Sequence, residues 1–443
     1  MTMATLEKPT GTDPIVFSLT SIAGSGRELI DEIRAAAMIQ TLPSTTWAKL
    51  NRLHLSGKSL SLSAAQVFSR DALALIEQGM LTHAHLNDMI ASRPEVEALQ
   101  ILNVIAEALA PHGPSLTTLD LSDNALGRKG VDAVAPLLTS CRETLRTLSF
   151  NNNGLEGRAT TQISHLMTNG QQITTQLTKF HTFNNLLESA GAIGLSPLLS
   201  KSPLLTDLRI SSTRIGSEGC IAIASACKQS GAPFTRLDFA DNNFMPEGLV
   251  TLCRDAIANL PMLNYLNLSA TAMGLKGLRA LEQALTKSGA PIEYLDISCN
   301  DLPVESSPIL GKLLSAIRDT IVHFKASENE LGSDGCIAVA QAIRGASRLT
   351  SLDLSVNEIT EAGAKVLADC LPPSLRQLEL NGNVISAAGV EAITEACGDF
   401  CNLGDMDLND EEYEEEEEDD EDESEDESEN VNAVADSVSS LNI

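Results

Sequence analysis

A repeating pattern of apolar residues runs through most of the chain. Its clearest copy covers residues 116–127 and has the form LxxLxLxxNxLG. Apolar residues two apart in such a stretch face the same side of a β-strand. Each copy is followed by a stretch rich in Ala and Leu, such as residues 219–226, which predicts a helix. The pattern therefore predicts a chain built from strand–loop–helix units.

Twelve units fit the pattern, and most of them begin 28 or 29 residues after the preceding one. This period is typical of leucine-rich repeats. It predicts an α/β leucine-rich-repeat solenoid of the ribonuclease-inhibitor type, with a parallel β-sheet on the concave face and helices on the convex face. The units begin at Leu50, Leu81, Leu116, Leu145, Leu177, Leu205, Phe234, Leu263, Ile292, Ile321, Leu349 and Leu375.

We expect three parts along the chain. Residues 1–45 lack the pattern and are predicted to be a partly helical N-terminal segment. Residues 46–404 are predicted to form the leucine-rich-repeat domain of about 12 repeats. Residues 405–443 are predicted to be a disordered acidic tail, because like charges in a low-complexity run repel one another.

The ninth position of the unit is Asn in eight units and Thr in two. The chain must turn sharply after each strand, and a buried amide can pair with backbone groups that would otherwise lack partners. We therefore interpret these residues as structural. They are Asn124, Asn153, Asn185, Asn242, Asn300, Asn329, Asn357 and Asn383, with Thr213 and Thr271.

The third and fifth positions of each unit are predicted to line the concave face, because the leucines around them point into the core. The fifth positions carry polar residues of mixed charge, including three His, four Asp, one Arg and one Lys, which suits protein recognition better than a small-molecule pocket. Tyr265 and Tyr294 occupy the third position of consecutive units and are predicted to stack, either as an interface hot spot or as a structural ladder.

Charge narrows the choice of partner. The net charge is −30, and residues 405–429 alone hold 19 acidic residues without a Lys or Arg. Nucleic acid and anionic membranes would be repelled, so we expect a protein partner, no nucleic acid and no membrane insertion. The tail is interpreted either as a device that steers a basic partner at long range or as a solubilising segment.

The nine cysteines contain no CxxC pair and mostly fall in predicted helices or strands, so we expect reduced, buried thiols. No apolar run approaches ~18 residues, and residues 1–20 lack the apolar core of a secretion signal. These observations predict a cytoplasmic protein.

Several segments resemble the GTPase-activating proteins of the nuclear-transport GTPase Ran, the RanGAPs, and their plant-type branch in particular. They are residues 93–100 (RPEVEALQ), 121–127 (LSDNALG), 202–216 (SPLLTDLRISSTRIG) and 383–386 (NVIS), and the resemblance spans about residues 50–430. It implies a protein that stimulates the GTPase activity of Ran without an arginine finger and without a cofactor, and that hydrolyses no GTP by itself. Ran in its GTP-bound form is the implied partner, and a Ran-binding protein is a second candidate.

The resemblance also implies the site residues. In RanGAPs, a loop asparagine before a consensus Asn contacts the place where Ran's own glutamine orients the attacking water. Asn153 holds the consensus position here, so Asn152 is the matching residue. Arg93 matches an arginine that the family needs and would anchor the GTPase. Asp123 and Asp241 occupy the same loop position as Asn152 in their own units and would meet basic residues of the partner.

Each of these assignments has a structural alternative. Arg93 could pair with Glu95 or Glu97 on the surface, Asn152 could be a second capping amide, and the two aspartates could be solvated loop acids. For the whole chain, the alternative is a non-catalytic binding scaffold like ribonuclease inhibitor. An acidic histone chaperone is a third hypothesis that rests on the tail alone.

The remaining motifs indicate no further chemistry. Residues 56–59 (SGKS) imitate a phosphate-binding loop, but Arg52 stands where that loop needs Gly. His83 and His85 have no Cys or carboxylate at metal-ligand spacing, so we expect no metal. Residues 1–45 contain no Trp-Pro-Pro, the motif that targets plant-type RanGAPs to the nuclear envelope, so that location is only a further candidate beside the cytoplasm.

Overall fold

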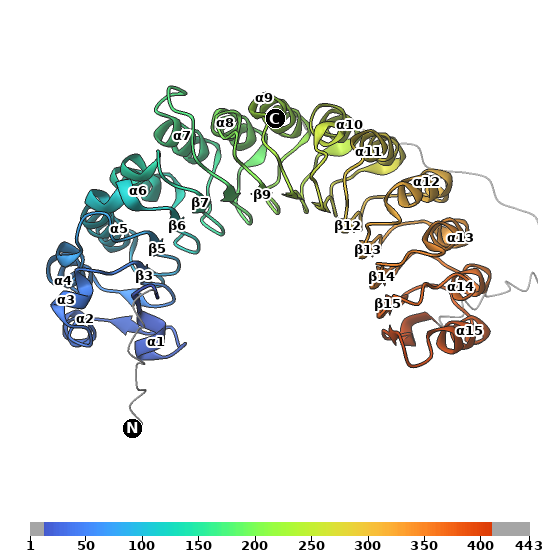
Figure 1. Cartoon of the computed structure of the whole chain (residues 1–443), viewed down its shortest axis with the longest axis horizontal. Coiled ribbons are helices and arrows are strands. Elements are labelled where there is room, and N and C mark those ends of the chain that lie inside the picture. The colour runs from blue at the N-terminus through green and yellow to red at the C-terminus, as the bar shows by residue number, and fades with distance from the viewer. Residues whose placement is uncertain (1–12, 410–443) are drawn as a thin grey trace, which may run out of the picture. The chain divides into compact units, whose positions relative to one another are not determined.

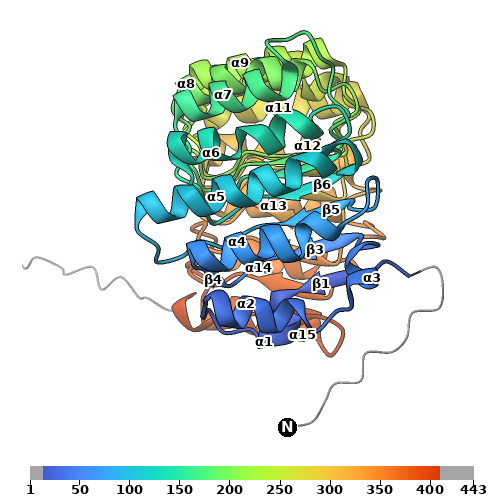
Figure 2. The ribbon, with the colours of Figure 1, turned by 90° about the vertical axis from the view of Figure 1, so that its left-hand side faces the viewer.

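The computed structural model describes residues 13–409, and these residues form one repeat array. Fourteen short strands make one parallel sheet, and neighbours along the chain are neighbours in the sheet. Within this array the strands line the inner side and the helices lie on the outer side (Figure 1). Figure 2 shows successive helices stacked above one another from α2 upward. The fold predicted from the repeat pattern is confirmed.

The strands of the sheet are three residues long, except the last, and each predicted strand lies at the third to fifth positions of its unit. They are β1 (Val16–Ser18), β3 (Arg52–His54), β5 (His83–His85), β6 (Thr118–Asp120), β7 (Thr147–Ser149), β8 (Lys179–His181), β9 (Asp207–Arg209), β10 (Arg236–Asp238), β11 (Tyr265–Asn267), β12 (Tyr294–Asp296), β13 (His323–Lys325), β14 (Ser351–Asp353), β15 (Gln377–Glu379) and β16 (Asn402–Leu403). The strands β2 (Leu29–Ile30) and β4 (Ser59–Leu60) form a separate parallel pair.

The helices follow the strands in chain order. They are α1 (Leu19–Ala23), α2 (Glu32–Ile39), α3 (Ser44–Trp47), α4 (Leu62–Asp71), α5 (Glu95–Leu109), α6 (Gly127–Cys141), α7 (Gly157–Thr168), α8 (Glu188–Ser200), α9 (Ser217–Ser230), α10 (Met245–Asp255), α11 (Gly274–Ser288), α12 (Ser307–Ile317), α13 (Gly332–Ile343), α14 (Glu361–Ala368) and α15 (Ala387–Cys397). Among residues 13–409, no helix has the length and apolar character needed to cross a bilayer.

The N-terminal segment continues the array. Strand β1 pairs in parallel with β3, and Phe17 packs against Trp47 and Phe68 with ring centroids 4.6 and 5.9 Å apart. These three buried rings pack together at the N-terminal end of the core. The boundary predicted after residue 45 therefore does not coincide with an edge of the sheet. The pattern missed β1 because Pro14 stands where the internal units begin with an apolar residue, and Ile22 stands at the ninth position in place of Asn.

The buried asparagines join consecutive units. Asn300 is fully buried, and its amide donates to the carbonyls of Leu268, Ile297 and Ser298. Its carbonyl oxygen accepts hydrogen bonds from the backbone N–H groups of Thr271 and Met273 in the preceding unit. One side chain thus satisfies backbone groups of two loops, as predicted for the ninth position.

Two units place other residues at the ninth position. In the first predicted unit it is Lys58, which is fully buried and donates from Nζ to the carbonyl oxygens of Ala23 and Gly26. The ammonium group thus holds the N-terminal turn against the array. In the second unit it is Met89, whose backbone N–H donates to the Asn124 amide oxygen at 3.0 Å.

Replacing Asn300 by Ala should lower the free energy of unfolding by about 3 kcal/mol, because several buried backbone groups would lose their partners. Urea unfolding followed by circular dichroism measures this. The matched control is Asp301→Ala: Asp301 is exposed, and Ala272 holds the same position of the preceding unit with the same left-handed backbone. Its effect should stay within about 0.5 kcal/mol. Equal unfolding midpoints for the two variants would contradict the structural role.

Candidate functional site

The loops that follow the strands share one backbone feature. The residue at the eighth position has a positive φ in every predicted unit: Gly57, Asp88, Asp123, Asn152, Asn184, Ser212, Asp241, Ala270, Cys299, Glu328, Val356 and Gly382. We call this row of residues the loop crest. Gly, Asn and Asp tolerate the left-handed conformation best, which accounts for their frequency in its first half.

The crest is held by bonds from one loop to the next. The backbone N–H of Asn152 donates to the carbonyl of Phe183 at 2.9 Å, and that of Asp123 donates to the carbonyl of Asn151 at 2.9 Å. Directly after Asn152, the buried Asn153 accepts a hydrogen bond from the N–H of Asn124. The buried ninth residue anchors the turn, so the side chain of the eighth residue faces solvent.

The Asn152 side chain is exposed and lies between two crest neighbours. Its Nδ2 donates to Asp123 Oδ1 at 3.0 Å, and its Oδ1 accepts from Asn184 Nδ2 at 3.0 Å. A carboxylate can only accept, so Asp123 fixes which end of the Asn152 amide faces it. One N–H and one lone pair of the amide remain for another molecule.

Asp123 and Asp241 are both exposed on the crest, as their positions predicted. Asp123 contacts Asn152 directly. Asp241 lies three units farther along and does not contact Asn152. At about 4.8 Å per strand, it is roughly 14 Å away along the crest.

Arg93 lies just before α5, in the long second unit. Its Nη1 is 3.9 Å from Glu97 Oε2, and its Nε is buried without a hydrogen-bond partner in the described part of the chain. Glu95, the other predicted partner, instead forms an ion pair with Lys129 of α6. Contact with Glu97, which was the structural alternative for Arg93, is therefore present, although 3.9 Å is too long for a hydrogen bond.

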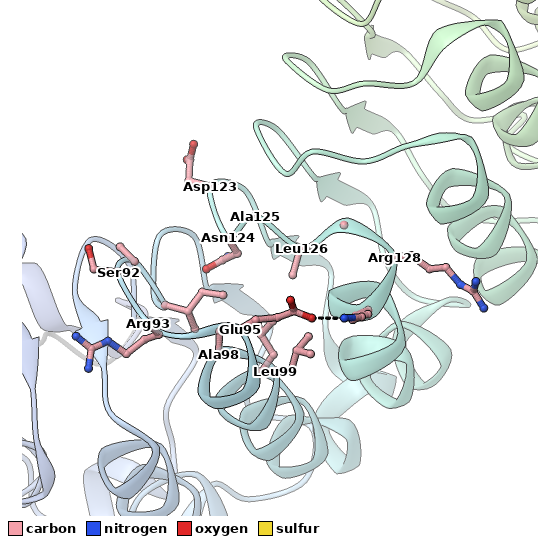
Figure 3. A pocket seen from close by; sticks show the side chains of 15 residues that line it. Ser92, Arg93, Glu95, Ala98, Leu99, Asp123, Asn124, Ala125, Leu126 and Arg128 are labelled. Atoms are coloured by element: carbon pink, nitrogen blue, oxygen red, sulfur yellow. Dashed lines mark hydrogen bonds and ion pairs between the residues drawn. The ribbon is translucent and has the colours of Figure 1, made fainter.

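A groove of about 600 Å³ separates the start of α5 from the start of α6. Its walls are mainly apolar, with Ile90, Ala98, Leu102 and Leu126 among them. Figure 3 shows Asp123 and the Arg93 guanidinium pointing away from each other, while the Glu95–Lys129 pair bridges the two helices. The groove thus lies between two predicted site residues that do not touch.

Asn184 was not among the site residues predicted from the sequence. This residue fixes the oxygen end of the Asn152 amide, and its signal was its eighth position in the unit that begins at Leu177. Sequence position alone could have placed it beside Asn152, because consecutive units align in register.

Sequence comparison with known proteins identifies the family of this chain. RAN GTPase-activating protein 2 of Arabidopsis thaliana is 34% identical over 399 residues, which cover 89% of this chain and 70% of that protein. This chain belongs to the RAN GTPase-activating protein family. RAN GTPase-activating protein 1 of the same plant is 38% identical over 121 residues, 27% of this chain and 21% of that protein.

Two further matches concern the repeats of this RanGAP family member. The family described as Leucine Rich repeat matches residues 112–135, 201–224, 347–368 and 372–393. Ribonuclease inhibitor of Sus scrofa is 26% identical over 382 residues, 84% of this chain and 79% of that protein. Both agree with the ribonuclease-inhibitor type of solenoid predicted from the repeat length.

Proposed function

We propose that this RanGAP family member stimulates GTP hydrolysis by Ran, and that the amide of Asn152 orients the catalytic glutamine of the GTPase. The observation that carries the proposal is the exposed Asn152 amide, which is held at both ends and retains one donor and one acceptor. An amide with this capacity can pair with the amide of a glutamine.

The chemistry asks for positioning more than for new reactive groups. Phosphoryl transfer depends on orienting the attacking water and stabilising charge, and a mobile glutamine does this poorly. Activation of small GTPases by ~10⁵-fold corresponds to about 7 kcal/mol off the barrier. One oriented amide supplies about 3 to 4 kcal/mol of such an effect, so exclusion of water by the docked proteins must supply the rest.

The mechanism needs no arginine finger from this chain. Arg93, which lies beside the groove, instead anchors the GTP-bound partner. Its guanidinium gives up the 3.9 Å contact with Glu97 and donates a hydrogen bond to an acceptor on the GTPase. Asp123 and Asp241 meet basic residues along the crest. The chain would thus be an activator whose partner performs the hydrolysis, with a Ran-binding protein as a further member of the complex. It would act in the cytoplasm or at the nuclear envelope.

The alternative is a scaffold that binds without stimulating hydrolysis, in keeping with the likeness to ribonuclease inhibitor. Phosphate release from GTP-loaded Ran, with and without the full chain, separates the two. Equal rates would reject activation and leave the scaffold.

Asn152→Ala should lower the maximal stimulated rate by about 10²- to 10³-fold, while affinity for GTP-loaded Ran changes little, because the amide acts on the oriented glutamine. Single-turnover phosphate release measures the rate, and titration measures the affinity. Ser212→Ala, two crest positions farther along, is the matched control and should retain the rate. Full stimulation of Ran by the Asn152→Ala variant would exclude Asn152 from the mechanism.

Asp123→Asn tests whether the carboxylate positions Asn152. With an amide as neighbour, the Asn152 side chain could turn over, because either end would find a partner. We expect the maximal rate to fall by roughly 3- to 10-fold with a smaller change in affinity, since the correct orientation would be only part of the population. If affinity falls and the rate at saturation is unchanged, Asp123 contacts the partner and does not position Asn152.

Arg93→Ala should weaken binding of GTP-loaded Ran by about tenfold or more, through loss of a charge-assisted contact. The rate at saturating concentration should change less than the affinity. Arg279→Ala removes an exposed arginine from α11 on the helical side and serves as the charge-matched control. If Arg93→Ala instead lowered the free energy of unfolding by as much as the binding free energy, the structural pairing with Glu97 would be supported.

A further inference from the structure

A second surface lies on the strands rather than on the crest. Lys179 of β8, Arg209 of β9 and Arg236 of β10 project from three neighbouring strands into the concave side, and we call these three residues the basic floor. Two carboxylates, Asp207 and Asp238, lie among them. None of these cations belongs to the site proposed for the GTPase.

The cations of the basic floor are more exposed than the carboxylates that lie among them. The side chains of Lys179, Arg209 and Arg236 are 42, 34 and 33% exposed, whereas those of Asp207 and Asp238 are 22 and 4% exposed. Asp238 lies 3.1 Å from Arg209 Nε, and Asp207 lies 2.8 Å from His181 Nε2. The two carboxylates are therefore less exposed than the three cations, and an approaching molecule meets more positive than negative charge.

The two guanidinium groups are also held in place. The central carbon of Arg209 is 3.7 Å from the centre of the Phe183 ring, and that of Arg236 is 3.5 Å from the centre of the Tyr265 ring. Tyr265 in turn stacks on Tyr294, with ring centres 4.2 Å apart and planes at 5°. Contacts of this kind fix long side chains, so little conformational entropy remains to be lost on binding.

Hydrogen-bonding capacity is left over. Within residues 13–409, Arg236 makes no side-chain hydrogen bond, since its contacts with Asp207 and Asp238 are 3.7 Å long. Arg209 uses only Nε, toward Ser211 and Asp238. Planar guanidinium groups with free N–H groups match carboxylates in a bidentate manner.

We propose that the basic floor binds an acidic, extended segment of a protein partner through its Asp or Glu side chains. Three cations and two carboxylates leave an excess of one positive charge. One carboxylate of a partner balances this charge, whereas a doubly charged phosphate exceeds it. The negative charge elsewhere on the chain does not prevent this, because charges more than about 8 Å away are screened at physiological salt. The surface thus differs from the crest in both location and charge.

The test uses the full chain and a fluorescent peptide of alternating Glu and Ser, with its Gln counterpart, followed by fluorescence anisotropy. We expect saturable binding of the Glu peptide and at least about tenfold weaker binding of the Gln peptide. A third peptide carries phosphoserine between the Gln residues. Tighter binding of this peptide than of the Glu peptide would overturn the assignment to carboxylates.

Single variants locate the contact. Lys179→Gln and Arg236→Gln should each weaken binding of the Glu peptide by about tenfold, and Arg236→Lys should have an intermediate effect because it keeps the charge and loses the planar fork. The matched control is Lys325→Gln, which removes a lysine from β13 on the same face. An equal loss of affinity in Lys325→Gln, or no saturable binding by the unmodified chain, would overturn the proposal.

Circular dichroism checks that each variant folds. If Arg236→Gln unfolds, the comparison of Lys179→Gln with Lys325→Gln decides. No GTPase is present, so the result is independent of the function proposed above.

Discussion

The buried asparagine amide at the ninth position, present in eight of the twelve predicted units, makes the hydrogen bonds on which the rest of the structure depends. Each turn after a strand leaves backbone groups inside the protein, where an unpaired group costs about 1 to 3 kcal/mol. The amide of the following unit satisfies them, as Asn185 does by accepting hydrogen bonds from the backbone N–H groups of Asn153 and Leu155. Consecutive loops must therefore align, and the exposed residue beside each amide falls into a row.

That alignment explains why the crest and the concave floor present different chemistry. In the first half of the crest, the left-handed backbone favours Gly, Asn and Asp, and the side chains of Asp123, Asn152 and Asn184 are joined by hydrogen bonds across units. On the floor, the strands carry long side chains at alternate positions, and neighbouring strands place Arg and aromatic residues face to face. One repeat thus supplies two surfaces, because its strand and its loop obey different backbone constraints.

The sequence was sufficient for the features that recur with the period. It predicted the strands, the buried asparagines and the stacked pair Tyr265–Tyr294, since each follows from position within a unit. It could not predict features that depend on a side chain's choice among partners, such as the contact of Arg93 with Glu97 rather than Glu95. It also missed β1, because capping strands are not bound by the consensus that internal strands obey. The roles of Asn152, Arg93, Asp123 and Asp241 stay predictions.

A stiff array has a particular advantage for positioning another protein's side chain. An amide on a mobile loop would have to be ordered at the moment of reaction, at the same entropic cost as the glutamine it is meant to hold. Asn152 is already fixed by the Asp123 carboxylate on one side, by the Asn184 amide on the other, and by the buried Asn153 next to it in the chain. Under the mechanism proposed for Asn152, alignment of the repeats therefore supplies the ordering of this amide before the partner binds.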